Sequence, residues 1–424
     1  MNGSTVMRGM RGLAGAVVAV GLVVALSGCG STIAGTAGPS EVDIRKLDVG
    51  SYPIEPVDIY ADYRPGFYAM GGIGAMRLAD YVATAVDVDP RLTFSADSGD
   101  FSAGVMDSLL GKTEATEEIA KRNKMLFGFK SEGGDRLTSI IDYGWPEVSR
   151  HTPGATTVNM LVMQFPDADS AQRAAHEFYQ ADVEANKDRT QPIRLSKYAD
   201  AQGQWRPGSP TGRSFLAHGS YVAAAVVTAA QPDQAAISSL SEKAYDTQLP
   251  LLDQLKPISD EETLHLPWDQ DHILSRTLNP EETYKPGFTG FPGIYGRRGI
   301  LQFLPYRAQA KQTFEAIGAD RFAITDAALL ARAESDESAK RAAAERLSIS
   351  PVAKQADAPA NVPDSTCVEN KVSSVLSSDA DDKRFTCIVV YRQYVSYLSA
   401  DQLLDAHQRA AAQYALLANS QWQP

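Results

Sequence analysis

The sequence has few of the residues on which protein chemistry most often depends. It contains 3 cysteines and 6 histidines in 424 residues, and aromatic residues make up 8% of the chain. A nucleophile elbow, a His-Glu-x-x-His zinc helix, a Walker loop and a redox Cys-x-x-Cys pair are all absent. The sequence therefore leans away from an enzyme, and it predicts neither a cofactor nor a metal centre.

Long hydrophobic runs are also absent, apart from one near the N-terminus. The uncharged stretch from Leu13 to Leu26 would extend about 21 Å as a helix, which is short of the roughly 30 Å hydrocarbon core of a bilayer. Arg8 and Arg11 precede it, and small residues lead from Leu26 to Cys29. This pattern is typical of a lipoprotein signal peptide that ends in a lipobox.

We therefore expect residues 1–28 to be a signal peptide and Cys29 to carry the lipid. Residues 29–46 are small, polar and aperiodic, which predicts a flexible tether. The expected location is the outer face of the cytoplasmic membrane, in the cell envelope, with the acyl chains at Cys29 as the contact with the membrane.

The remaining cysteines form an even pair in a compartment that favours disulfides. A bond between Cys367 and Cys387 would close a loop of roughly 20 residues and contribute about 3 kcal/mol to stability. The alternative is that both ligate a metal, but they lack the spacing of a zinc site and have no histidine beside them in the sequence. A structural disulfide is the prediction.

Basic residues are outnumbered, with 40 Lys and Arg against 52 Asp and Glu, for a net charge of −12. A surface of this charge repels nucleic acid and anionic headgroups. We expect no nucleic-acid partner. The oligomeric state is not set by the sequence.

The composition, with 44% hydrophobic residues, is that of a globular protein, and the length favours two domains. An apolar strand pattern at 160–165 precedes an Ala-rich helix pattern at 170–175, and the same order recurs at 328–333 and 338–343. After each copy, strand-like segments lead into a further helix; these are 213–228 and 233–255, then 383–398 and 399–418.

This repetition predicts an α+β fold of two related modules, each of the order strand, helix, strand, strand, helix, with an antiparallel sheet. We place an N-terminal domain at 47–258 and a C-terminal domain at 259–424. We also predict a helix over 75–86, a turn at 71–74 before it, and an exposed loop at 353–364.

Two motifs carry a resemblance. The stretch Leu47-Asp48-Val49-Gly50-Ser51-Tyr52-Pro53 follows the tether, and Arg77-Leu78-Ala79-Asp80-Tyr81-Val82 comes shortly before Asp89-Pro90. The chain resembles a family of cell-envelope lipoproteins of mycobacteria and related actinobacteria, whose biochemical function is uncharacterised. The resemblance implies an envelope location and an actinobacterial host, and it supplies no catalytic residues.

Aromatic residues are concentrated around two Pro-Gly-Phe segments, at 65–67 and 286–288. Together they could line a groove for an apolar or glycan ligand, with core packing under loops as the alternative. The candidate ligand-binding residues are Tyr63, Phe67, Tyr68, Phe288, Phe291 and Tyr295.

The histidines give weaker evidence of a functional site than the aromatic residues. His265 and His272, with Asp269 and Asp271, have metal-like residue types without the spacing of a metal site. His407 fits a hydrogen-bonded position on the apolar face of the last helix.

The sequence thus predicts a membrane-anchored, non-enzymatic binding or interaction module of the envelope. Two alternatives stay open: an envelope hydrolase with dispersed catalytic carboxylates, and a structural subunit of an envelope complex.

Overall fold

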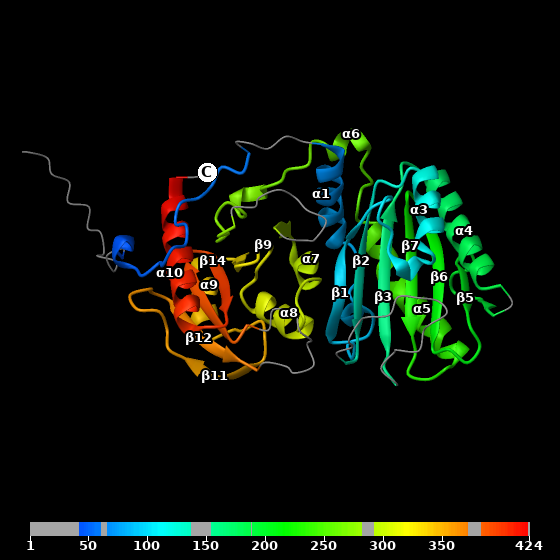
Figure 1. Ribbon diagram of the computed structural model, residues 1–424. Coiled ribbons are helices and arrows are strands. Elements are labelled where there is room, and N and C mark those ends of the chain that lie inside the picture. The colour runs from blue at the N-terminus through cyan, green and yellow to red at the C-terminus, as the bar shows by residue number, and fades with distance from the viewer. Residues whose placement is uncertain are drawn as a thin grey trace, which may run out of the picture. The chain divides into compact units, whose positions relative to one another are not determined.

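Two antiparallel sheets, each packed against helices, make up the folded part of the chain (Figure 1). The computed structural model describes residues 42–60, 66–136, 154–187, 189–281, 292–371 and 383–422. The predicted signal peptide, Cys29, Tyr63, Phe288 and Phe291 lie outside these ranges. From Val42 onward the chain forms one compact unit.

The N-terminal sheet is antiparallel and has the strand order β1-β2-β3-β7-β6-β5-β4. Its strands are β1 (Phe94–Phe101), β2 (Phe127–Gly134), β3 (Thr157–Gln164), β4 (Gln191–Ile193), β5 (Gln202–Trp205), β6 (Thr211–His218) and β7 (Tyr221–Thr228). The helices of this module are α1 (Phe67–Ala79), α2 (Ala85–Val88), α3 (Thr113–Arg122), α4 (Ala168–Ala185) and α5 (Gln234–Leu252), followed by the single turn α6 (Asp260–Thr263).

The C-terminal sheet repeats this arrangement, with the order β8-β9-β10-β14-β13-β12-β11 when read from the equivalent edge. Its strands are β8 (Gly293–Tyr295), β9 (Arg321–Ile324), β10 (Ala328–Arg332), β11 (Val352–Ala356), β12 (Ser365–Asn370), β13 (Phe385–Tyr391) and β14 (Tyr394–Ala400). Its helices are α7 (Arg297–Leu301), α8 (Arg307–Ala316), α9 (Asp336–Ala344) and α10 (Leu403–Asn419). The predicted α+β class with two antiparallel modules is confirmed.

Helices cover both faces of the N-terminal sheet, because its central strands are apolar on both sides. In β3, Leu161 and Met163 pack with α3 and α4, whereas Met160 and Val162 face the core that includes α5. All eight residues of β7 are buried. Such continuous burial explains why its sequence is an unbroken apolar run and not an alternating one.

The two modules have different stabilising contacts at one equivalent position of their sheets. In the C-terminal module Cys367 and Cys387 lie directly opposite each other on β12 and β13 and are bonded as a disulfide. In the N-terminal module the pair at the matching point, counted from the following hairpin, is Gly203 and Ser214. Here the Ser214 hydroxyl bonds to the Tyr245 hydroxyl of α5 at 2.9 Å.

Three local predictions are wrong. Residues 71–74 lie inside α1, which begins at Phe67 and ends at Ala79, and not in a turn before a helix over 75–86. Ser399 belongs to β14, where its hydroxyl bonds to that of Thr386, so the last helix starts only at Leu403. The expected loop at 353–364 begins with strand residues of β11.

The chain is ordered earlier than the predicted tether allows. Ile44–Lys46 form a 3-10 turn, and the segment 42–60 then packs against the C-terminal module. The Arg409 guanidinium of α10 donates to the Tyr52 hydroxyl at 3.1 Å, and Asn419 donates to the carbonyl of Ile54 at 2.9 Å. The first described residues thus lie on the last helix (Figure 1).

Candidate functional site

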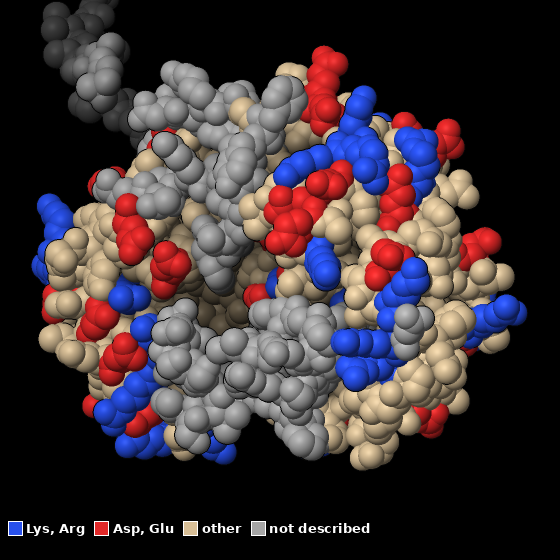
Figure 2. Space-filling view, turned by 45° about the vertical axis from the view of Figure 1, so that its right-hand side comes forward, with Lys and Arg blue, Asp and Glu red and all other residues tan. Residues whose placement is uncertain are grey.

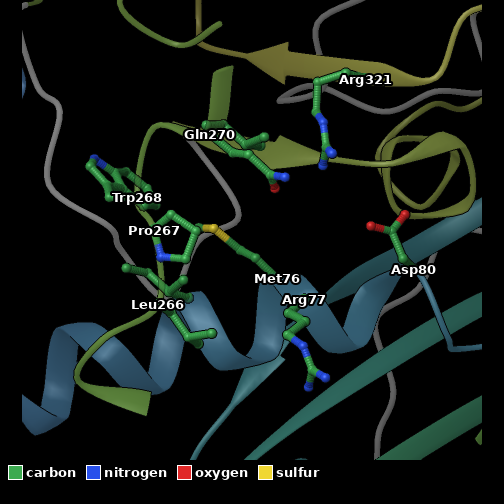
Figure 3. A pocket seen from close by; sticks show the side chains of 10 residues that line it. Met76, Arg77, Asp80, Leu266, Pro267, Trp268, Gln270 and Arg321 are labelled. Atoms are coloured by element: carbon green, nitrogen blue, oxygen red, sulfur yellow. The ribbon is translucent and has the colours of Figure 1, made fainter. Parts of the chain in front are cut away.

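A pocket of about 120 Å³ lies where elements of the two modules meet (Figure 3). It is lined by residues of α1, of the segment that follows α6, of β8 and of β9. These are Ile73, Met76, Arg77, Asp80, Leu266, Pro267, Trp268, Gln270, Ile294 and Arg321. One side is apolar, and the other carries an amide, a carboxylate and a guanidinium group.

Helix α1 supplies four of these side chains from one face. Residues 73, 76, 77 and 80 are spaced three or four apart, so they follow each other along the helix. The glycine-rich start of α1 lets it approach the sheet closely: a Cβ on Gly74 would lie 2.5 Å from the ring of Phe127. Packing against β2 therefore compensates for the poor helix propensity of glycine.

Asp80 joins the two modules at the base of the pocket. Its two carboxylate oxygens accept hydrogen bonds from the backbone N–H groups of Gly296 at 2.8 Å and Gly299 at 2.7 Å. It thereby caps the first turn of α7 from another part of the chain. A Cβ at either glycine would lie within 3 Å of this carboxylate, so both positions need glycine. Burial raises the pKa of Asp80 above its ordinary value.

Arg321 projects from β9 toward the space between Gln270 and Asp80 (Figure 3). Its Nε is buried and has no hydrogen-bond partner within the described residues. It lies 3.5 Å from Asp271 Oδ2, with which Arg321 forms an ion pair, and Asp271 also pairs with Arg332 at 3.0 Å. Arg321 thus has capacity to bind a further anionic group.

The segment beside Arg321 is backbone-strained. Asp271 and the following His272 both have positive φ angles, 62° and 53°. Two successive non-glycine residues in the left-handed region are uncommon, and such strain is concentrated at ligand sites. It lies next to Gln270, whose amide faces the pocket in Figure 3.

Arg77 lines the pocket but serves mainly to hold α1 in place. Its Nη2 donates to the carbonyl of Lys256 at 2.9 Å, and in Figure 3 its guanidinium points away from Gln270 and Arg321. Its Nη1 is buried without a hydrogen-bond partner among the described residues. Of the two arginines, Arg321 is thus the one whose guanidinium faces the pocket in Figure 3.

The aromatic residues predicted from the sequence are only partly described. Tyr295 is 1% exposed and packs against Phe303, with 4.8 Å between ring centroids, so for this residue the core-packing alternative holds. Phe67 and Tyr68 form the first turn of α1. Helix α1 and β8 contact each other, so both Pro-Gly-Phe segments lead into walls of this pocket.

The predicted metal-like group of histidines and aspartates is not assembled. Asp269 accepts hydrogen bonds from the backbone N–H groups of Leu274 and Ser275 and so stabilises its own turn. Within the described ranges, one set of three His, Cys, Asp or Glu side chains has ligand atoms within 4.8 Å of one another: Cys367, Cys387 and His407. Because His407 is 40 residues from Cys367 in the sequence, the sequence analysis did not predict that it lies beside the two cysteines.

Carboxylates converge elsewhere, on the ammonium group of Lys130. Its Nζ lies 2.6 Å from Asp97, 2.8 Å from Asp107 and 3.1 Å from Glu132. These three acids share the single positive charge of the lysine, and they do not line the pocket. Among the described lining residues Asp80 is the one carboxylate, which does not supply the pair that glycoside hydrolysis requires.

A second, open depression of about 430 Å³ lies between α4 and the ends of β5 and β6. Ala175 and Phe215 are among its apolar lining residues, and Gln172, Asp200 and Gln202 are the polar ones. It is the more polar of the two concavities, and hence the place where a glycan would fit better than an apolar ligand.

Comparison with family models identifies the family to which the chain belongs. Residues 62–268 match the model described as "Domain of unknown function (DUF7373) N-terminal", and residues 273–420 match the one described as its C-terminal domain. The chain belongs to the DUF7373 family. The boundary between the two DUF7373 domains falls after the predicted one at 258, within the segment that lines the pocket. The pocket of this DUF7373 chain is therefore built from both domains.

Among the solved structures that match, a similar one covers part of the DUF7373 chain. It is the extracellular domain of PknH from Mycobacterium tuberculosis, with 10% sequence identity and a TM-score of 0.26, covering 41% of this chain and 93% of that one. No curated protein matches the chain. In the described residues, no helix is both long and apolar enough to cross a bilayer.

Proposed function

We propose that this DUF7373 chain is an exported, lipid-anchored binding protein whose ligand is a small amphiphile with an anionic head. The pocket between the two DUF7373 domains is the binding site. The observation that carries the proposal is Arg321, a partly buried guanidinium that faces the apolar wall of the pocket and whose Nε is ion-paired with Asp271 at 3.5 Å but makes no hydrogen bond within the described residues. Unsatisfied buried donors are rare in native proteins and need an explanation.

The apolar part of the ligand would contact Met76, Leu266 and Pro267, which lie together on the side away from Arg321 (Figure 3). The pocket is smaller than the roughly 300–1,000 Å³ of sites for drug-sized ligands. A head group and the adjoining end of a chain fit this size, and the rest of the ligand would extend into solvent or over neighbouring residues.

Local contacts, and not a long-range field, would select the anion. Figure 2 shows acidic and basic side chains interspersed over the described part of one face of the protein. The net charge of −12 repels an anion from a distance, so its binding would depend on contacts inside the pocket. Charge-assisted hydrogen bonds to Arg321 contribute about 1.5–3 kcal/mol, which corresponds to a preference of roughly tenfold to a hundredfold over an uncharged head.

Export and anchoring are supported by the lipobox that ends at Cys29, by the apolar stretch before it, and by a buried disulfide, which fits an oxidising compartment. An anchored binder with an amphiphilic ligand suits the surface of a membrane. In this proposal the protein holds or presents an envelope lipid and performs no chemistry on it.

The direct test is calorimetric titration with four amphiphiles whose alkyl chains have seven or eight carbons: octanoate, octyl phosphate, octyl glucoside and octyltrimethylammonium. The protein is the chain without residues 1–29, used below the critical micelle concentration of each probe. We expect the two anions to bind at one site and the sugar and the cation to bind at least tenfold more weakly. Tighter binding of octyl glucoside would contradict the anionic head and favour the glycan alternative.

The matched variants are Arg321→Met and Arg194→Met, the latter an exposed arginine after β4. Arg321→Met should weaken octanoate binding by tenfold or more and remove the preference for anions, while Arg194→Met should change neither. If both variants bind like the natural chain, the site is elsewhere. If none of the four probes binds, the proposal is wrong and a protein partner becomes the better hypothesis.

A further inference from the structure

A cluster of soft ligand atoms lies in the C-terminal module, outside the proposed amphiphile site. Cys367 and Cys387 are both fully buried, at 0% exposure, on the neighbouring strands β12 and β13. An imidazole nitrogen of His407 lies within 4.8 Å of both sulfur atoms. His407 is in the second turn of α10, which packs directly on β13.

His407 is held in the manner of a metal ligand. Its Nε2 lies 2.7 Å from the carbonyl oxygen of Asp357, so this nitrogen carries the proton and donates it. The hydrogen bond fixes the ring orientation and leaves Nδ1 as the nitrogen with a free lone pair. Histidines that bind metals almost always donate their other N–H group to such a carbonyl or carboxylate.

We propose that reduction of the Cys367–Cys387 disulfide creates a site for a thiophilic d¹⁰ cation, zinc(II) in the first instance, with Cys367, Cys387 and His407 as its ligands. The proposal is independent of the amphiphile pocket, with which the three residues share no element. It makes the disulfide a switch between a closed, metal-free state and an open, metal-binding one.

The reaction balances with a dithiol as the reductant. The dithiol gives two electrons and two protons to the Cys367–Cys387 bond, which breaks to leave two thiols, and its own two sulfurs become a disulfide. Zinc then binds as both cysteine thiols lose their protons to solvent. Because the two strands already bring the cysteines together and α10 brings the histidine, side-chain rotation is enough to separate the sulfurs around an ion.

The ligand set suits zinc. Two thiolates and one imidazole are soft to borderline donors of the kind that zinc selects. Three protein ligands leave a fourth tetrahedral position for water, as in zinc sites that are not purely structural. His407 is partly exposed whereas both sulfurs are buried, so an ion would enter past the imidazole.

The test compares oxidised and reduced protein, both as the chain without residues 1–29. The reduced form is prepared with dithiothreitol, which is then removed by gel filtration without oxygen. We expect the reduced chain to bind one Zn²⁺ in equilibrium dialysis and the oxidised chain to bind none at this site. Co²⁺ in place of zinc should give the near-ultraviolet charge-transfer absorption of thiolate coordination.

The matched variants are His407→Gln and His176→Gln, the latter an exposed histidine on α4 that also makes one side-chain hydrogen bond. His407→Gln should weaken zinc binding by the reduced chain at least about tenfold, and His176→Gln should leave it unchanged. Circular dichroism follows the fold on reduction. The proposal is overturned if the reduced chain binds no zinc, if it unfolds, or if His407→Gln binds zinc as tightly as the natural chain.

Discussion

The Asp80 carboxylate accepts a 2.7 Å hydrogen bond from the backbone N–H of Gly299, across the boundary between the two DUF7373 domains. The second oxygen of Asp80 accepts from Gly296. One side chain therefore satisfies two backbone donors at the start of α7, and it does so next to the pocket.

Replacing Asp80 by alanine should lower the free energy of unfolding by about 2–4 kcal/mol, since two partly buried N–H groups lose their acceptor. Asp80→Asn keeps an acceptor oxygen for one of them and should cost about half as much. Urea denaturation measures both, with the exposed Asp200→Ala as the control. A loss below 0.5 kcal/mol for Asp80→Ala, on the order of a neutral surface change, would refute the capping role.

The buried carboxyl of Asp100, on β1, predicts a pH dependence of stability. Neither of its oxygens has a hydrogen-bond partner within the described residues, and burial raises its pKa from 3.8 to about 7. Between these two values the folded chain holds a proton that the unfolded chain has released. The free energy of unfolding should therefore fall as the pH rises from about 4 to about 7.

Asp100→Asn stays neutral and should abolish this fall. At pH 8 the variant should be more stable than the natural chain by about 2 kcal/mol, roughly half the full value of a three-unit shift because the side chain is partly exposed. At pH 4 the two should be equal. Urea denaturation at both pH values measures this difference. The same difference in the free energy of unfolding between the two chains at pH 4 and at pH 8 would show that Asp100 ionises normally in the fold.

Lys130 should be far more important for stability than an ordinary lysine. Its side chain is 12% exposed and pairs with Asp107 and Glu132, which are 11% and 4% exposed. Lys130→Met leaves these carboxylates without a counter-charge and should cost about 3–5 kcal/mol. Lys121→Met breaks an exposed pair with Glu117 and should cost no more than about 0.5 kcal/mol.

A double variant separates charge from packing at this position. Adding Glu132→Gln to Lys130→Met should recover part of the stability, because one buried charge is then removed together with its partner. Equal losses for Lys130→Met and Lys121→Met would show that the buried cluster is no stronger than a surface pair.

Asp271 should compete with the proposed ligand for Arg321. Asp271→Asn removes the competing charge and keeps a residue type that tolerates the positive φ angle. Octanoate affinity should then rise by about threefold to tenfold, less than the value of one strong charged hydrogen bond. Asp320→Asn, which breaks the salt bridge to Arg332 and removes only a longer-range attraction to Arg321, is the control. A weaker affinity in Asp271→Asn would instead make Asp271 the residue that positions Arg321.

The parts of the fold that were visible in the sequence are those with strong local signals. Helices α4 and α9 directly follow the N-cap residues Asp167 and Ser335, whose side chains accept hydrogen bonds from the backbone N–H groups of Ser170 and Ser338, and each helix follows an apolar strand. The edge strand β1 and its neighbour β2 were not predicted, because polar residues of the Lys130 cluster and several glycines interrupt their apolar pattern. Alternation alone does not detect such strands.

The sequence indicated only part of the candidate site. Its walls come from α1, from the segment around Gln270 and from β9, which are far apart in sequence, so neither spacing nor periodicity brings Asp80 to Arg321. The two Pro-Gly-Phe segments were the local signal, and they flank α1 and β8. His407 and the two cysteines show the same limit, since a helix and two strands must fold before the three become neighbours.

The segment 42–60 packs on α10, which lies at the other end of the sequence. The order in which these two parts of the chain become available therefore affects folding. Tyr52 and Arg409 are 357 residues apart in sequence and bond to each other. In an exported chain that crosses the membrane from its N-terminus, this segment arrives first and its binding surface last. If this chain is exported as proposed, folding finishes only after the C-terminal module has crossed, and the early segment lacks its contacts with α10 until then.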